Sequence, residues 1–166
     1  DAESHRKALA AREHLNEEIA PVPVKAHAAV AYNGLREDYT PDKLATIRPL
    51  FDKDNGTVPA GNSSQISDGA SATLIMSAEK ANELGMKARA KFSSFAVAGA
   101  DPVTMLKGPI PATEKLLVRT GMKIEDIDLF EVNEAFASVV LAWQKETGAD
   151  LDRVNVNGGA IALGHP

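Results

Sequence analysis

Three short stretches combine amide, acidic, hydroxyl and imidazole side chains with glycine: AGNSSQISDGA at 60–70, EVNEAF at 131–136 and NGGAIALGHP at 157–166. In the second stretch, Asn133 and Glu134 stand where a strand-like run gives way to a helix-like run. One interpretation of the pair is helix capping, since Asn is a favoured N-cap residue and an acid suits the first turn. In the third stretch, His165 is either a surface imidazole beside a turn or a side chain that the turn aims at a ligand. Taken singly, these residues do not establish a function.

Several familiar kinds of site do not fit these stretches. The glycines at 158, 159 and 164 do not form a G-x-G-x-x-G pattern, so support for a dinucleotide site is weak. None of the serines at 63, 64, 67 and 71 lies in a G-x-S-x-G elbow, which favours turn and capping roles over a nucleophilic one. The sequence contains no Cys, so disulfides, thiolate metal sites and thiol nucleophiles are excluded from it. We expect no metal site.

Helical periodicity and end signals predict five helices that would position these residues. Residues 2–20 carry apolar side chains every three or four positions and are closed by a proline. Thr40 and Pro41 suit an N-cap and a first helical residue, Ser77 suits the N-cap of a helix that Gly85 ends, and 112–120 is a further helix. The clearest helix is 133–148, which has an apolar face and a terminal glycine.

Apolar runs between these helices predict strands at 71–76, 88–100, 127–132 and 154–157, whereas 21–44 reads as extended pieces and loops with a turn signal at Asn33-Gly34. Residues 51–71 form a long, turn-rich connection, and connections of that length are more often functional than idle, so we expect ligand contact there. Strands that alternate with helices favour an α/β layered fold.

Composition narrows the class of protein further. The chain has 166 residues, 44% of them hydrophobic and 25% charged, as in ordinary globular proteins. The formal net charge of -5 and the scattered basic residues argue against a nucleic-acid partner. No long uncharged apolar run is present to span a membrane or serve as a signal peptide, which favours a cytoplasmic protein.

Taken together, FEVNEAFA at 130–137 and VNVNGGAIALGHP at 154–166 closely resemble the paired signatures of the thiolase family, CoA-dependent enzymes that cleave or form 3-oxoacyl thioesters. The resemblance covers essentially the whole chain, including 48–85 and DPVTMLKGPIPAT at 101–113. It implies the layered α-β-α-β-α thiolase fold in part. Residues 1–67 would belong to the loop domain, 68–88 would be the last strand and helix of the N-terminal core domain, and 89–166 would be the first part of the C-terminal core domain.

By this resemblance, His165 donates a hydrogen bond to the thioester oxygen and helps to activate a nucleophilic Cys, while the Asn133 amide holds a water that donates beside it. Ser64 is similar to a serine that touches the pantetheine arm of CoA, and Phe51 and Met105 resemble residues that line the tunnel for that arm. Ala135 and Phe136 would face the reacting carbons. Leu106 and Lys107 depart from the small residue that many members carry there, which leaves acyl chain length open.

The resemblance also implies what this sequence lacks. A thiolase uses one nucleophilic Cys and one acid/base Cys, so we expect the chain to be a fragment cut at Pro166 and to show no thiolysis by itself. The expected parent is an acyltransferase that works through an acyl-cysteine intermediate, with CoA and acyl-CoA as substrates, no permanently bound cofactor, and a homodimeric or homotetrameric state. The alternatives are a non-catalytic thiolase-like lipid-transfer or scaffold protein and, more distantly, a relative of the ketoacyl synthases.

Overall fold

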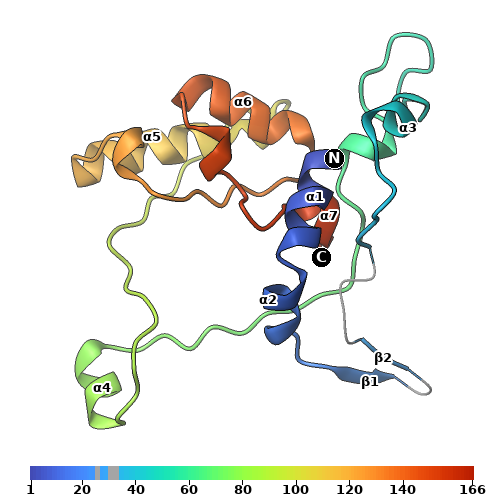
Figure 1. Ribbon diagram of the computed structural model, residues 1–166. Helices are drawn as coiled ribbons and strands as arrows, with labels where there is room; N and C mark the ends of the chain where they lie inside the picture. The colour runs from blue at the N-terminus through green and yellow to red at the C-terminus, as the bar shows by residue number, and fades with distance from the viewer. Residues whose placement is uncertain (25–26, 30–33) are drawn as a thin grey trace.

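The computed structural model describes residues 1–24, 27–29 and 34–166, and most of the regular secondary structure in them is helical (Figure 1). Of the predicted Asn33-Gly34 turn, Asn33 lies outside the described residues. In chain order the elements are α1 (Ala2–Ala10), α2 (Arg12–Glu17), β1 (Val22–Val24), β2 (His27–Ala29), α3 (Pro41–Ala45), α4 (Ala78–Glu83), α5 (Pro109–Thr120), α6 (Ala137–Thr147) and α7 (Ala160–Leu163). Single 3₁₀ turns lie at Ala60–Asn62, Met105–Lys107, Ile124–Asp126 and Leu151–Arg153.

Most helix ends lie where the local sequence signals place them. The Thr40 hydroxyl accepts a hydrogen bond from the amide three residues on at 3.3 Å, and the Ser77 hydroxyl does the same at 3.2 Å. Gly121 and Gly148 end α5 and α6 with φ of 69° and 73°, a left-handed conformation that glycine adopts without steric cost. These ends are therefore fixed by interactions within a few residues of each helix.

Two helix predictions need correction. The predicted helix over 2–20 divides into α1 and α2 and ends at Glu17. Helix α6 begins at Ala137, with Phe136 as an N-cap that makes no side-chain hydrogen bond. Asn133 and Glu134 therefore precede the helix, and the interpretation of the pair as capping residues is wrong.

The main core lies beneath α6 and centres on Trp143, which is 2% exposed. Its ring packs edge-on against Phe130, with 5.2 Å between the ring centroids and 62° between the ring planes. The indole Nε1–H donates to the Thr113 hydroxyl of α5 at 2.8 Å, so the one polar atom of the ring is paired. Val140, Ala149 and Val154 complete this buried cluster.

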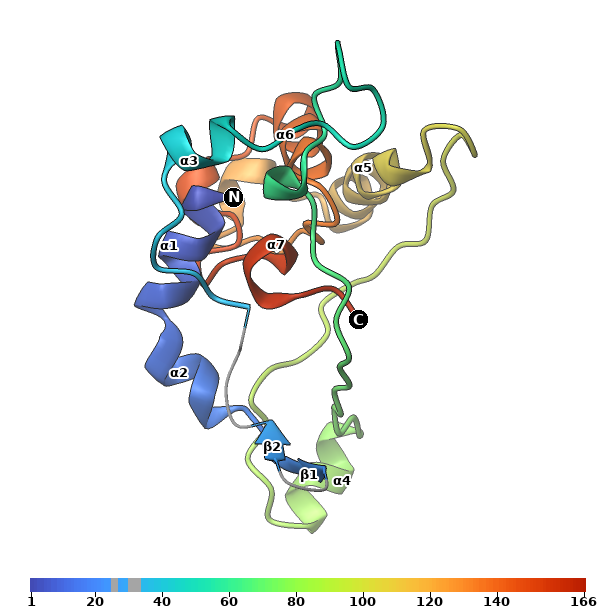
Figure 2. The same ribbon diagram turned by 90° about the vertical axis from the view of Figure 1, so that its right-hand side faces the viewer.

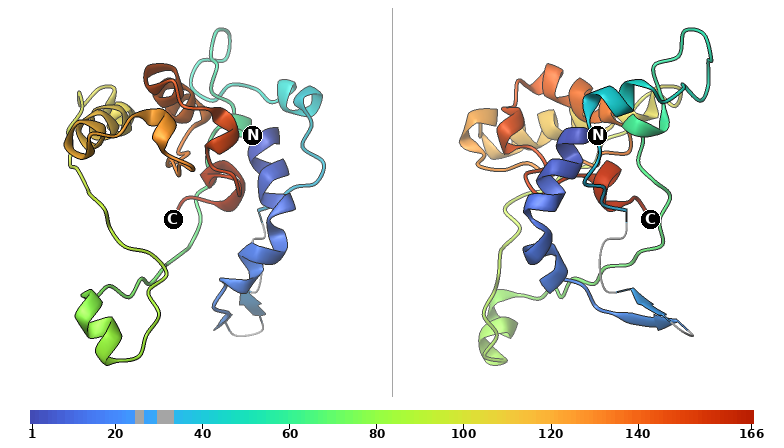
Figure 3. Two further views of the ribbon diagram at one scale, coloured as in Figure 1. Left: turned by 60° about the vertical axis from the view of Figure 1, so that its left-hand side comes forward. Right: turned by 45° about the vertical axis from the view of Figure 1, so that its right-hand side comes forward.

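The four predicted strands do not form ladders in the described part of the chain. The last two meet only at one parallel bridge between Phe130 and Val154. Segments 71–76 and 88–100 run as open traces (Figures 1 and 3), and neither has a backbone–backbone partner among the described residues. A strand exists only where a neighbouring backbone accepts and donates its hydrogen bonds. Instead, the one sheet found among the described residues lies in the predicted loop region, where β1 pairs antiparallel with β2.

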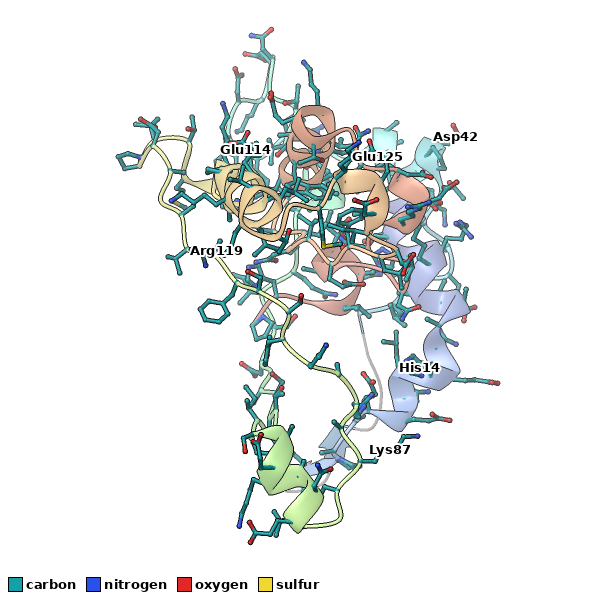
Figure 4. All side chains as sticks on the ribbon, turned by 90° about the vertical axis from the view of Figure 1, so that its left-hand side faces the viewer. His14, Asp42, Lys87, Glu114, Arg119 and Glu125 are labelled. Carbon is teal, nitrogen blue, oxygen red and sulfur yellow. The ribbon has the colours of Figure 1, made fainter. Side chains whose placement is uncertain are left out.

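The open segments leave much of the chain exposed. The accessible surface is 12432 Å², whereas a compact monomer of 17.6 kDa exposes about 7,900 Å². Side chains of α5 hold the 88–100 segment by its carbonyls: Lys115 Nζ donates to Val97, and the Arg119 guanidinium, labelled in Figure 4, donates to Phe95. Among the residues described, no helix has both the length and the apolar character that a membrane crossing requires.

Helix α1 supports the end of the chain. It lies beside α7 in the views of Figures 1 and 2, although the two helices are at opposite ends of the sequence. Ala8 of α1 is fully buried in this contact. Lys7 extends along the neighbouring loop, where its Nζ donates to the carbonyls of Val154 at 3.0 Å and Leu151 at 3.3 Å. The N-terminal helix therefore forms the support of the C-terminal glycine-rich loop.

Candidate active site

The loop that carries Asn133 leaves the core at Phe130 and is clamped by Asn155. The Phe130 amide donates to the Arg153 carbonyl and the Asn155 amide donates to the Phe130 carbonyl, both at 2.9 Å. The Asn155 side chain then continues the pairing, because its Oδ1 accepts from Val132 N–H at 2.8 Å and its Nδ2 donates to the Val132 carbonyl at 2.9 Å. Asn155 is 5% exposed and has φ 46°, a conformation that Asn tolerates better than most residues. Its amide therefore takes the place of a strand neighbour.

The loop that carries His165 depends on glycine at both ends of α7. Gly158 has φ 87°, and a Cβ there would lie 2.6 Å from the Cβ of Ala8 on α1. Gly164 has φ 99°, and a Cβ there would collide with the Ser67 hydroxyl. Only a residue without a side chain fits such backbone angles at such close approach. The glycines thus let this loop pack tightly between α1 and the 63–67 segment and present His165 at its end.

Residues 63–67 lie between the two loops and bond to both. The Ser64 amide donates to the Ala135 carbonyl at 3.0 Å, within an antiparallel bridge. The His165 amide donates to the Gln65 carbonyl at 3.0 Å, within a parallel bridge. This segment belongs to the turn-rich connection that the sequence marked for ligand contact. It acts as a backbone spacer that sets the two loops at a fixed separation.

The spacer brings the side chains of Asn133 and His165 together. Asn133 Nδ2 lies 3.5 Å from His165 Nε2. That distance is long for a hydrogen bond, so neither nitrogen is committed to the other. Asn133 is exposed and His165 is half-buried, so neither residue is enclosed by the fold. In the tautomer that carries its proton on Nε2, the imidazole and the amide offer two N–H donors that a single oxygen atom, or an oxygen and a water, can reach.

A pocket of about 270 Å³ opens beside Asn133. Partial desolvation raises the pKa of the Glu131 carboxyl in its wall above the ordinary value, and the nearby positive charge of Lys7 opposes this shift. The described residues contain no group of three or more His, Asp or Glu side chains that is placed to hold a metal ion. The pocket is lined by Glu131, Val132, Asn133, Glu134, Gly158, Gly159, Ala160, Leu163 and Gly164.

The remaining candidate residues fall into two groups. Ser64, Ala135 and Phe136 lie at the junction between the spacer and the Asn133 loop, where the Ser64 amide donates to the Ala135 carbonyl and Phe136 forms the bridge to Ser63. Phe51 is 82% exposed and does not line the pocket beside Asn133. Met105 is 66% exposed and lies in a second pocket of about 340 Å³, which shares no lining residue with the first. Ser64, Ala135 and Phe136 therefore lie next to the loops that carry Asn133 and His165. Phe51 and Met105 lie apart from the pocket beside Asn133.

Two residues that hold the site loops by side-chain hydrogen bonds are not recognisable from the sequence. Asn155, in the stretch read as a strand, clamps the Asn133 loop through its side chain. Ser4, in the first helix, hydrogen-bonds to Glu134. Neither position stands out by spacing, because each partner is far away in the sequence. The one available signal was an Asn followed closely by a glycine pair, a combination typical of backbone with positive φ.

Comparison with known proteins places these loops in a family. The profile described as "Thiolase, N-terminal domain" matches residues 2–79, and "Thiolase, C-terminal domain" matches residues 86–166. The chain is 58% identical to the 3-ketoacyl-CoA thiolase of Aliivibrio salmonicida over 80% of this chain and 35% of that protein. It is 49% identical to the 3-ketoacyl-CoA thiolase of Vibrio parahaemolyticus over 99% of this chain and 45% of that protein.

Solved structures give the same result for the fold. The dimeric peroxisomal thiolase of Saccharomyces cerevisiae superposes with a TM-score of 0.94 at 40% identity, over 99% of this chain and 43% of that chain. Human mitochondrial 3-ketoacyl-CoA thiolase in complex with CoA superposes with a TM-score of 0.92 at 40% identity, over 99% of this chain and 42% of that chain. The predicted α/β thiolase fold, present in part, is therefore confirmed.

The chain spans less than half the length of the relatives that it matches. Segments 71–76 and 88–100 follow the backbone path of these relatives, although neither has a backbone partner among the described residues. With two thiolase domain profiles covering nearly every residue and a closely superposable backbone, the chain belongs to the thiolase family.

Proposed function

We propose that the protein containing this chain is a CoA-dependent acyltransferase that cleaves 3-oxoacyl-CoA with CoA, or condenses two acyl-CoA molecules, through an acyl-cysteine intermediate. The observation that carries the proposal is the approach of Asn133 Nδ2 to His165 Nε2, 3.5 Å apart, beside a pocket that Asn133 lines. The names of the relatives, 3-ketoacyl-CoA thiolases, agree with it.

The pair suits the charge that this reaction develops. In thiolysis, a cysteine thiolate adds to the 3-oxo carbon, and the bond between C2 and C3 then breaks. The electron pair left on C2 spreads onto the thioester oxygen until a proton reaches C2. His165 Nε2–H donates to that oxygen, and the Asn133 amide holds a water that donates beside it. Donors set in place before the reaction stabilise such charge at little reorganisation cost.

The thiolate itself comes from outside these 166 residues, which contain no Cys. His165 would favour its ionised form, since the thiolate rather than the thiol is the nucleophile. The acyl group remains on the cysteine sulfur after the first step. The thiol of CoA then attacks this thioester and releases the shortened acyl-CoA.

The remaining parts of the proposal concern binding, organisation and assembly. Ser64, Phe51 and Met105 would contact the pantetheine arm of CoA, and Ala135 and Phe136 would face the reacting carbons. The exposure of Phe51 and Met105 supports a ligand-facing role. We propose that residues 1–67 belong to the loop domain, 68–88 to the N-terminal core domain and 89–166 to the C-terminal core domain. We also propose a homodimer or homotetramer in the cytoplasm, of which the dimeric state has a precedent in the yeast relative.

The test is His165→Ala in the intact protein, assayed by thiolysis of acetoacetyl-CoA. Loss of an oxyanion donor lowers turnover about 10²–10³-fold. CoA binding, measured by calorimetry, should weaken far less, because the imidazole acts on the reacting oxygen rather than on the CoA arm. Equal losses in turnover and CoA binding would assign His165 a structural role and overturn the proposed chemistry.

A further inference from the structure

The Glu134 carboxylate joins the two loops of the site. Its Oε2 atom accepts a hydrogen bond from the Ser4 hydroxyl at 2.7 Å and another from the Ile161 amide at 3.1 Å. The Ser4 oxygen in turn accepts a hydrogen bond from the Gly159 amide at 2.9 Å. Three hydrogen bonds therefore connect one residue of α1, one residue of the Asn133 loop and two residues of the His165 loop.

The position of this network in the chain gives it a consequence for the site. Glu134 directly follows Asn133, so holding its side chain holds the backbone that carries the amide. Gly159 and Ile161 lie at the beginning of α7, the short helix that ends just before His165. The network thus holds the two loops that carry the pair relative to one another, through contacts other than those of the 63–67 spacer.

Burial makes the network stiff. Ser4 is 6% exposed and Gly159 is also buried, so water does not readily replace a lost partner. An unpaired buried amide is costly, which favours the bonded arrangement over alternatives. A Cβ at Gly159 would collide with the Glu134 carboxylate, so the loop and the acid are packed in direct contact.

We propose that Ser4 and Glu134 are positioning residues that hold Asn133 and His165 at the separation required for the acyl transfer. This inference rests on the proposed function and deepens it by assigning a role in that site to the N-terminal helix. Neither side chain is one of the two donors that we place at the thioester oxygen, although Glu134 forms part of the pocket wall. Their effect passes through hydrogen bonds to the loop backbones, so it concerns the rate of the chemical step rather than affinity for CoA.

The test compares Ser4→Ala, Glu134→Ala and Glu134→Gln in the intact protein, with Arg6→Ala as the control on the same helix. One oxygen of Glu134 accepts both hydrogen bonds, and the amide oxygen of Gln can accept them as well. Displacement of reacting groups by about 1 Å costs as much as 10²-fold in rate, so we expect Ser4→Ala and Glu134→Ala to lower kcat about 10- to 100-fold. The KM for CoA should stay unchanged, and Glu134→Gln should recover most of the activity. Arg6, whose side chain is 66% exposed, should be neutral.

Several outcomes would overturn the inference. One is a kcat for Ser4→Ala equal to that of Arg6→Ala. Another is a melting temperature that falls for Ser4→Ala while kcat does not, which would make the network purely structural. A third is a Glu134→Gln variant as impaired as Glu134→Ala, which would assign the effect to charge. Should Glu134→Ala fail to fold, Ser4→Ala alone decides.

Hydrogen exchange, which does not depend on enzymatic activity, tests this inference separately from the proposed function. Hydrogen exchange of the Gly159 and Ile161 amides should accelerate in Ser4→Ala and Glu134→Ala but not in Glu134→Gln. If the intact protein shows no thiolysis, the proposed function is wrong, and so is the kinetic part of the inference. If the enzyme is active but the exchange of the Gly159 and Ile161 amides is unchanged in Ser4→Ala and Glu134→Ala, the inference about the network is wrong while the proposed function stands.

Discussion

Asn155→Asp tests with a minimal change whether the Asn155 amide takes the place of a strand neighbour for Val132. The aspartate keeps an oxygen that can accept from Val132 N–H and keeps tolerance for φ 46°. It replaces the Nδ2 donor, now 2.9 Å from the Val132 carbonyl, with a second oxygen. Two acceptors then face each other in a site where Asn155 is 5% exposed.

The expected magnitude follows from that geometry. Removing the donor leaves the Val132 carbonyl without its partner in a buried site, which costs about 1–3 kcal/mol. The free energy of unfolding should therefore fall by about 1–3 kcal/mol. Asn155→Gly should also destabilise, although it relieves the positive φ, because it removes both side-chain bonds to Val132.

Urea unfolding followed by tryptophan fluorescence suits this measurement. Trp143 is the only tryptophan, and it belongs to the buried cluster that contains Val154, the neighbour of Asn155. Asn16→Asp makes the same chemical change at an exposed position and serves as the control. A fall for Asn155→Asp no larger than that for Asn16→Asp would refute the account of the amide as a strand substitute.

Two further changes test the packing and electrostatics around the same loops. Gly158→Ala should lower the free energy of unfolding by about 1–3 kcal/mol, because it adds a Cβ 2.6 Å from that of Ala8 at φ 87°; urea unfolding with stability near wild type would contradict the close packing. Desolvation raises the pKa of Glu131, so the folded state binds more protons than the unfolded state and stability declines as pH rises from the ordinary value of about 4.3. Glu131→Gln should therefore be more stable than wild type at neutral pH, with the gain shrinking below about pH 4; a gain independent of pH would contradict this cause.

The helices were predictable because their signals are local. The hydroxyls of Thr40 and Ser77 bond within three residues, and Gly121 and Gly148 end their helices by their own conformation. The predicted strands depend on partners elsewhere. Apolar sequence marks a segment such as 71–76 as suitable for a sheet, but the pairing requires a neighbour that the described chain does not supply.

The candidate site divides in the same way. Asn133 and His165 were recognisable from two motifs, and the structure brings them together. The hydrogen bonds that hold them, from Asn155 and Ser4, join residues whose separation in sequence carries no periodic signal. Glu134 shows where local signals mislead. An acid at the start of a helix is typical of capping, but the Glu134 carboxylate accepts a hydrogen bond from the distant Ile161 amide instead.

The 63–67 spacer also bears on how the molecule folds. Its backbone bonds reach Ala135 and His165, residues about 70 and 100 positions further along, so closing them carries a large loop entropy. Local helices form long before such distant contacts. The amide and the imidazole therefore settle into their working arrangement among the last events of folding, and slow recovery of activity should trail the return of helical structure.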